Sequence, residues 1–245
     1  MNKIWIIARK DISEAFRSRS TYVFIIIMII LTFSYISGYE SYVKSLTTQQ
    51  SIDSYSRSFL NNLAYILPIT FSIFVCSIFA NYAVIIDKAK RNIESLMATP
   101  VSVKQIWMGK TLAVTMPSLI VGIAIAILSY LVITIGFVMP KTGSFIFPDA
   151  LAIVSAFIIV PLLVFVIVSI VTYIQLVITN PRIANFVFSG IFLLLLFGVN
   201  ALGALRISIS YLPLIFLGVT IIGSGASYIL SRSLTKEKIV LSSKV

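Results

Sequence analysis

Six long segments without a single charged residue decide what this chain can fold into. They cover residues 20–39, 58–86, 111–140, 150–181, 183–205 and 207–231. A helix needs about 20 apolar residues to cross the hydrocarbon core of a bilayer, and each segment can supply one. Charged residues make up only 11% of the chain and its mean hydropathy is +1.05. This composition excludes both a soluble enzyme and a disordered chain.

We therefore expect an all-α polytopic membrane protein with six transmembrane helices in a single domain, residues 1–245. The predicted spans are residues 20–39, 61–86, 111–138, 150–178, 183–204 and 209–231. Fifteen of the 19 Lys and Arg residues fall on one side of these spans. Because Lys and Arg gather in cytoplasmic loops, we predict that the N-terminus and the tail, residues 232–245, are cytoplasmic. The net charge of +11 follows from this asymmetry, and it favours membrane lipids rather than nucleic acid as a partner.

Residue types that carry catalysis and ion coupling are missing from the predicted spans. The chain has no histidine, its one cysteine (Cys76) lies in an apolar segment, and no charged residue lies inside a span. We expect no metal site or bound cofactor in this chain. The charged residues that a proton-coupled carrier usually has inside the membrane are absent from the predicted spans. The uncharged polar residues in or near the spans include Asn81, Gln175, Asn185 and Asn200. These four are expected to hydrogen-bond between helices, with contact to a transported substrate as the alternative.

Several local signals concern helix ends and helix packing. A Ser-, Tyr- and Gln-rich stretch over residues 39–62 is expected to form the first external loop, and Asp149 is expected to cap the fourth span. Small residues four apart allow helices to approach closely. Such pairs occur at Gly122 with Ala126 and at Gly223 with Ser227.

The N-terminal segment, residues 4–19, has the spacing of an amphipathic helix. Such a helix can lie along the inner membrane surface with Trp5 and Phe16 in the interface and with Arg9 and Arg17 toward water. The alternative is a basic flank that only orients the first span.

The second predicted cytoplasmic connection, residues 87–104, carries the most specific pattern in the chain. A short helix over about 89–98 should end at Thr99, because the residue before Pro100 is disfavoured in the helical region. Its apolar residues form an edge that another protein could contact. They are Ile93, Leu96 and Met97.

A capping box and a rejected nucleotide motif follow this helix. Ser102 and Gln105 have the spacing of a capping box that opens the next helix. Gly109 and Lys110 resemble the end of a phosphate-binding loop, but position 104 is Lys instead of the required glycine, and no strand precedes the segment. We expect no ATP to bind there.

This connection resembles that of ABC-2 type permeases, the membrane subunits of ABC exporters. The residues that match the family pattern are Asp87, Lys88, Ile93, Glu94, Leu96, Ala98, Thr99, Pro100, Val101, Ser102, Gly109 and Lys110. Arg91 and Asn92 stand where the family usually has glycine and threonine. The N-terminal Arg9-Lys10-Asp11-Ile12 is similar to the family's interface helix.

The resemblance implies an ABC-2 (type V exporter-like) permease in the plasma membrane. Two copies of this chain, or this chain and a related one, would form the pathway, and two copies of a separate ATPase subunit would bind ATP and Mg²⁺. The connection would be the coupling helix that docks on the ATPase, with Glu94 pairing with a basic group there. The residues implied in coupling are Lys88, Lys90, Arg91, Ile93, Glu94, Leu96, Met97, Thr99 and Pro100.

Two other functions stay open at this point. The chain could be a membrane scaffold or assembly factor that transports nothing. A secondary carrier is the third possibility, and the lack of charges inside the spans disfavours it.

Overall fold

The computed structural model describes residues 3–17, 19–46, 48–90, 92–178 and 211–235, with a few single positions besides. In these ranges the chain is helical apart from turns and one extended segment. Among the described residues, five helical segments are long and apolar enough to cross a membrane. They are Ile26–Val43, Gln49–Ile86, Val103–Thr142, Ala150–Val177 and Leu212–Ser233. The predicted span over residues 183–204 lies almost wholly outside the described residues.

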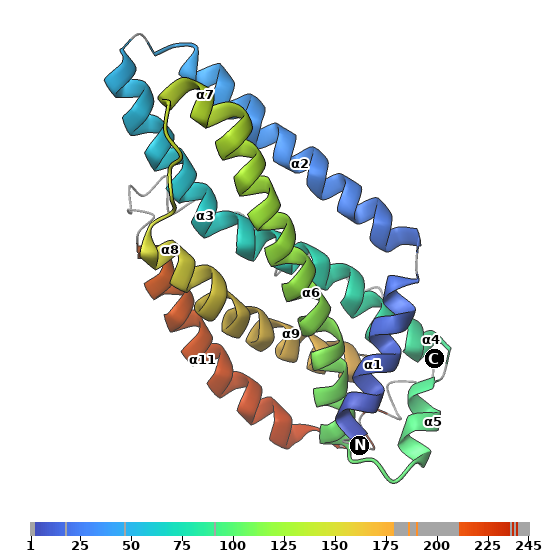
Figure 1. Ribbon diagram of the computed structural model, residues 1–245. Helices are drawn as coiled ribbons and strands as arrows, with labels where there is room; N and C mark the ends of the chain where they lie inside the picture. Colours follow the sequence, from blue (N-terminus) through green and yellow to red (C-terminus); the bar gives the residue numbers. More distant parts are fainter. Residues whose placement is uncertain are drawn as a thin grey trace.

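The helices form a slanted bundle in which α3 and α6 cross at the centre and α2, α9 and α11 lie around them (Figure 1). The elements up to Pro100 are α1 (Lys3–Phe16), α2 (Arg19–Val43), α3 (Gln49–Ala80), η1 (Asn81–Ile86), α4 (Asp87–Ala89) and α5 (Asn92–Ala98). Those that follow are α6 (Val103–Ile133), η2 (Thr134–Val138), α7 (Met139–Thr142), α8 (Ala150–Val154), η3 (Ser155–Ile159), α9 (Val160–Val177) and α11 (Leu212–Ser233). The three η elements are π-helical turns within longer helices. Such turns insert a residue into a helix and shift the faces beyond it.

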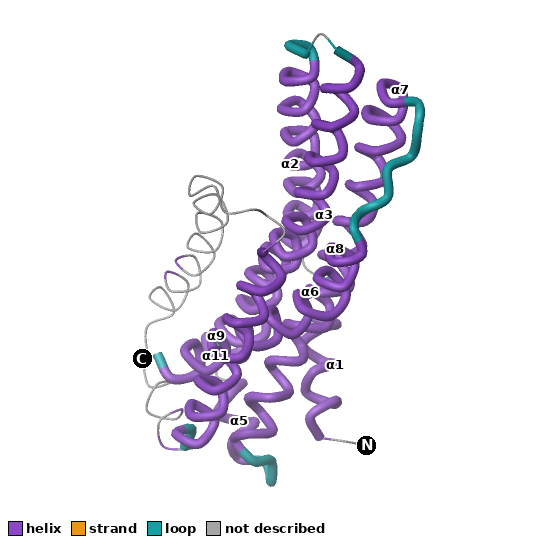
Figure 2. Tube along the Cα trace, turned by 90° about the vertical axis from the view of Figure 1, so that its left-hand side faces the viewer, coloured by secondary structure: helices purple, strands orange, loops and turns teal. Residues whose placement is uncertain are grey.

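The expected external loop over residues 39–62 is wrong, because α2 continues to Val43 and α3 begins at Gln49. The two helices form a tall hairpin whose far end is close to α7 (Figure 2). Polar and aromatic side chains hold the hairpin together there. The hydroxyls of Tyr39 and Ser56 share a hydrogen bond of 2.7 Å, and the rings of Tyr42 and Tyr55 stack with centroids 4.3 Å apart. The polar and aromatic composition of this stretch therefore reflects side-chain contacts between α2 and α3.

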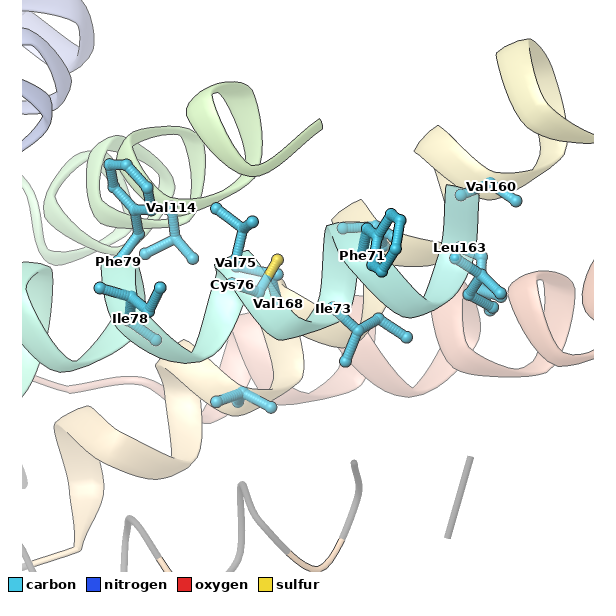
Figure 3. Close-up of a cluster of buried hydrophobic side chains, with 14 of the residues drawn as sticks. Phe71, Ile73, Val75, Cys76, Ile78, Phe79, Val114, Val160, Leu163 and Val168 are labelled. Atoms are coloured by element: carbon cyan, nitrogen blue, oxygen red, sulfur yellow. The ribbon is translucent and has the colours of Figure 1, made fainter. Parts of the chain in front are cut away.

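The hydrophobic core is centred on α3. Phe71 and Phe79 of α3 are each only 1% exposed. Figure 3 shows the α3 side chains enclosed by Val114 of α6 and by Leu163 and Val168 of α9. A proline at position 68 is accommodated inside α3. This packing leaves α2 and α11 at the edge of the bundle.

Both predicted pairs of small residues lie where helices approach closely. A Cβ atom added at Gly122 of α6 would lie 2.5 Å from the Cα atom of Ser72 in α3. One added at Gly223 of α11 would lie 2.6 Å from Cγ1 of Val166 in α9. A neighbouring hydrogen bond of 2.7 Å joins the hydroxyls of Ser227 and Ser169. Close packing at these sites confirms the interpretation of the small-residue pattern.

We predict that Gly122→Val destabilises the protein by about 1–3 kcal/mol, the usual cost of overpacking a core. The added methyl groups would meet the backbone of Ser72, which cannot move aside without shifting α3. Thermal unfolding in detergent measures the change. Gly136→Val is the matched control, because a Cβ atom at that exposed position meets nothing within 4 Å. Equal melting temperatures for the two variants would contradict the α3–α6 contact.

Candidate functional site

At one end of the bundle α1, α5 and the first turns of α6 lie together (Figure 1). This is the end that the charge pattern predicts to be cytoplasmic. The predicted amphipathic helix forms there as α1 and ends at Phe16. A Cβ atom at Gly109 of α6 would lie 3.1 Å from Ile7 of α1, so the two helices touch. The glycine therefore allows α1 to pack flat on α6.

The outer face of α1 has the residues that were expected at a membrane surface. Trp5 is 46% exposed and Phe16 is 38% exposed. Arg9 and Arg17 are exposed as well. The ring of Phe16 also contacts Phe79 of α3, with centroids 5.2 Å apart. The position of α1 at a membrane surface stays a prediction.

Lys110, in the second turn of α6, is the centre of the site. Its side chain is fully buried, and its ammonium group donates to Oδ2 of Asp11 at 3.0 Å and to Oδ2 of Asp87 at 2.6 Å. The third donor goes to the backbone carbonyl of Ala83 in η1. An ammonium group has three hydrogens, so these three acceptors satisfy it. We refer to Asp11, Asp87 and Lys110 as the buried charge cluster.

The buried charge cluster is tied to further polar groups at its edge. Asn92, the first residue of α5, donates from Nδ2 to Oδ1 of Asp87 at 2.9 Å. Nζ of Lys10 lies 3.6 Å from the same carboxylate oxygen and 3.7 Å from Glu14. Through these contacts the carboxylate of Asp87, in α4, connects to α1, α5 and α6.

The two carboxyl groups of the cluster differ in their pKa. Burial raises the pKa of Asp11 above its usual value, and the nearby charge of Lys110 offsets this only in part. Burial also acts on Asp87, but the charge of Lys110 and the hydrogen bond from Asn92 outweigh it, so the pKa of Asp87 is lowered. The protein therefore stabilises the charged form of Asp87 and disfavours that of Asp11.

Lys88 makes a second connection from the same segment. Its ammonium group donates to the backbone carbonyls of Gln175, Leu176 and Ile178 at 3.3, 3.2 and 2.6 Å. The first two belong to the last turn of α9 and the third to its C-cap residue, where a positive charge complements the helix dipole. Burial lowers the pKa of Lys88 to about 8. The end of the fourth predicted span is thus held by the residue next to Asp87.

The structure confirms where the predicted helix over about 89–98 ends, although α4 ends at Ala89 and α5 begins only at Asn92. The helix ends at Ala98, and the hydroxyl of Thr99 donates to the carbonyl of Leu96 at 2.6 Å. Ser102 and Gln105 form both hydrogen bonds of the capping box at the start of α6. Lys3 of α1 donates to the carbonyl of Pro100 at 3.0 Å, which fixes the turn between the two helices.

The expectation that the apolar edge of α5 faces a partner is wrong for two of its residues. Ile93 is 1% exposed and Met97 is 9% exposed, and both belong to the core of this chain. Leu96 is half-buried against the same core. The hydrogen bond from Asn92 to Asp87 and the one from Lys3 to Pro100 turn the helix inward. The face left open carries Ser95, Ala98, Thr99 and Pro100.

The remaining predicted residues are spread over the molecule. Lys90 is exposed at the end of α4, and Glu94 is a helical position in α5. Asn81 is half-buried in η1, and Gln175 is only 2% exposed in α9. Arg91, Asn185 and Asn200 lie outside the described residues. The structure therefore places two of the four expected pathway residues, Asn81 and Gln175, and leaves their contact with a substrate a prediction.

The sequence interpretation missed the role of Asp11 and Lys110. Asp11 was named only within the N-terminal family resemblance, but it is 4% exposed and shares the buried face of α1 with Ile7 and Ala15. The spacing of these three, four residues apart, is the signal that could have placed Asp11 inward. Lys110 directly precedes a segment of 30 uncharged residues. Its ammonium group is therefore far from water, which is a signal that it needs a partner within the protein.

Together, apolar helices that can span a membrane and a folded, charged connection at one end define a polytopic membrane protein with a structured element between its spans. Comparison with protein families matches residues 5–229 to the family described as ABC-2 family transporter protein. The chain belongs to this family, and it is a multi-pass membrane protein, in keeping with the plasma membrane. It is a transport component and not itself an enzyme. A comparison with curated proteins gave no match.

We predict that Lys110→Met destabilises the protein by about 3–5 kcal/mol, because it leaves two carboxylates buried without their cation. Thermal unfolding in detergent gives the change. Lys104→Met is the control, since Lys104 is exposed on the same helix. Adding Asp11→Asn and Asp87→Asn to Lys110→Met should restore most of the loss, because the buried charges are then gone. A triple variant as unstable as the single one would contradict the cluster.

The two carboxylates should respond differently to neutralisation. The lowered pKa of Asp87 contributes stability that is present above its unfolded-state pKa, about 3.9, and lost as the pH falls through the folded-state pKa. At neutral pH, Asp87→Asn should therefore lower stability by about 1.5–3 kcal/mol, the worth of hydrogen bonds to a charged group.

Asp11 has the opposite sign. Its raised pKa means that the folded state is favoured below the ordinary pKa and loses that advantage as the pH rises through the raised value. Asp11→Asn should thus leave stability at neutral pH unchanged or higher, and it should remove the gain that the natural protein shows on acidification toward the raised pKa. Unfolding curves between pH 4 and 8 measure both variants. A larger loss for Asp11→Asn than for Asp87→Asn would refute the assignment.

Proposed function

We propose that this chain is the permease subunit of an ATP-driven exporter, which forms the translocation pathway and couples to a separate ATPase subunit through α5. Members of the ABC-2 family generally pair with ABC ATPase subunits. The observation that carries the proposal is that the connection between η1 and α6 is a folded element, joined by polar contacts to α6 through Asp87, to the end of α9 through Lys88 and to α1 through Pro100.

The geometry of α5 suits docking on its outer side. Its apolar residues pack α5 against the rest of the chain. A force applied to α5 would therefore be transmitted to the helices that it contacts, whereas a flexible loop would not transmit it. The open face carries small and polar residues at Ser95, Ala98 and Thr99. Such a face accepts close contact with a partner without exposing a large apolar patch before assembly.

Three contacts form the route by which α5 would act on the spans. Asn92 leads to Asp87 and through Lys110 to α6. Lys88 leads from the same segment to the end of α9. The indole of Trp107 in α6 also donates to the carbonyl of Ser169 in α9 at 3.0 Å. In the proposal, closure of the ATPases pushes α5, and these contacts move α6 and α9 together as one body.

The remaining parts of the proposal concern partners and cargo. ATP and Mg²⁺ would bind to two copies of the ATPase, and a second permease, identical or related, would complete the pathway. The cargo would be hydrophobic or amphipathic, because the spans predicted from the sequence contain no charged residue that could pair with an ion inside the bilayer.

Co-purification tests the proposal. The tagged chain should retain an ATP-hydrolysing protein with a Walker A motif when it is extracted from its native membrane. The double variant Ser95→Arg/Ala98→Arg should reduce this association about tenfold or more, since a lost interaction of 1.4 kcal/mol has that effect. Ser41→Arg, exposed at the opposite end of the bundle, is the control and should retain the ATPase.

Two outcomes would count against the exporter. If no ATPase associates with the natural sequence in the presence or absence of nucleotide, the chain is better explained as a scaffold. If association survives the Ser95→Arg/Ala98→Arg change, the ATPase docks elsewhere and α5 has no coupling role.

A further inference from the structure

A cavity of about 280 Å³ lies in the half of the bundle remote from the buried charge cluster. It is enclosed by α3, α6, the extended segment 143–149 and the helix that starts with α8. Figure 1 shows that segment running from α7 to α8 along the outside of the bundle. The cavity has no part in the coupling site described above.

Hydrogen bonds hold the wall of the cavity in place. The hydroxyl of Tyr130 donates to the carbonyl of Ile146 at 3.0 Å. At the end of the segment, Nδ2 of Asn61 donates to Oδ2 of Asp149 at 2.8 Å, and the amide of Asp149 donates back to Oδ1 of Asn61 at 3.3 Å. Asp149 thus begins α8 as predicted, but its carboxylate binds Asn61 instead of capping the helix. The extended segment is therefore a fixed wall with anchored backbone groups.

The lining of the cavity is hydrocarbon. Every lining side chain is Leu, Ile, Ala, Pro or Phe except that of Tyr130, whose hydroxyl is already used. A polar ligand would lose its water without gaining a partner, and water itself needs two or more polar contacts to stay. The cavity therefore selects an apolar occupant.

The cavity opens sideways toward the surroundings of the bundle. Among its lining residues, Ile127 and Leu131 of α6 are 44% and 37% exposed, and Ile153 and Phe157 of the fourth helical segment are 46% and 55% exposed. All four lie on segments apolar enough to span the membrane. An opening at that position faces the acyl chains of the bilayer.

We propose that this cavity binds one acyl chain of a membrane phospholipid, inserted between α3 and α6 beneath the extended segment. The acyl chain fills the space in which the side chains lining the cavity do not pack against one another. The small residues Ala64, Ala152 and Ala156 leave the room for it. Occupancy does not require the ATPase, so this inference stands or falls separately from the exporter function.

Photolabelling in lipid nanodiscs tests the site. The full chain is reconstituted with phosphatidylcholine that contains a small fraction carrying a diazirine in the acyl chain, and the labelled peptides are identified by mass spectrometry. The exposed residues Ile221 and Ile222 of α11 provide the reference for ordinary boundary lipid. We expect labelling at residues 123–131 and 145–157 to saturate at a low probe fraction, while labelling of α11 rises in proportion to the probe.

Variants that fill the cavity with a larger side chain (filled variants) distinguish a bound acyl chain from lipid that only diffuses along the protein surface. Ala156→Phe, and independently Ala64→Leu, should reduce labelling of the cavity by about tenfold or more relative to α11, because each displaced methylene weakens binding roughly fourfold. Ile135→Phe is the control, since Ile135 is exposed and does not line the cavity. Size-exclusion profiles identify which filled variant is folded, and the folded one is compared.

Two labelling results would contradict the proposed acyl-chain site. Cavity labelling that scales with probe fraction just as α11 does would show boundary lipid only and would overturn the proposal. Unchanged labelling in a folded filled variant would overturn it as well, because the label would then not come from within the cavity.

Discussion

One buried ammonium group holds together the end of the molecule that distinguishes it from a plain bundle of membrane helices. Lys110 belongs to α6, yet its three donors go to α1, to η1 and to the residue that follows η1. A charged lysine at a fully buried position is unfavourable by several kcal/mol unless charge and hydrogen bonds compensate it, so these partners must stay in place. The positions of α1 and α5 both follow from this requirement.

The large features of the fold were predictable because they depend on composition over long stretches. Segments without charge must leave water, and five of the six expected spans have described helices that correspond to them. The turn after α5 and the cap of α6 were also predictable, since Thr99-Pro100 and Ser102 with Gln105 act within a few residues of one another. Such signals are local and do not depend on how the helices assemble.

The inward or outward direction of a short helix could not be obtained in the same way. The apolar residues of α5 could equally cover their own chain or a partner. Lys3 decides this by its contact to Pro100, 97 residues later, and Asn92 by its bond to Asp87, which Lys110 of α6 holds in place. Asp11 is a similar case, because a carboxylate on the face of an amphipathic helix is inward only if a cation 99 residues later lies against it. The tall α2–α3 hairpin was missed since serine and tyrosine pair across it and allow helices to extend beyond the most apolar stretch.

The π-helical turn η1 separates the packed part of α3 from Asp87. In a regular helix each residue turns the chain by about 100°, so one inserted residue displaces every later side chain around the axis by that angle. The face of α3 that fills the core is consequently not the face that continues to Asp87. A helical wheel drawn through this region without the extra residue would place the carboxylate of Asp87 on the side away from Lys110. The buried charge cluster therefore depends on the number of residues in the second span, because one residue more or fewer would turn Asp87 away from Lys110.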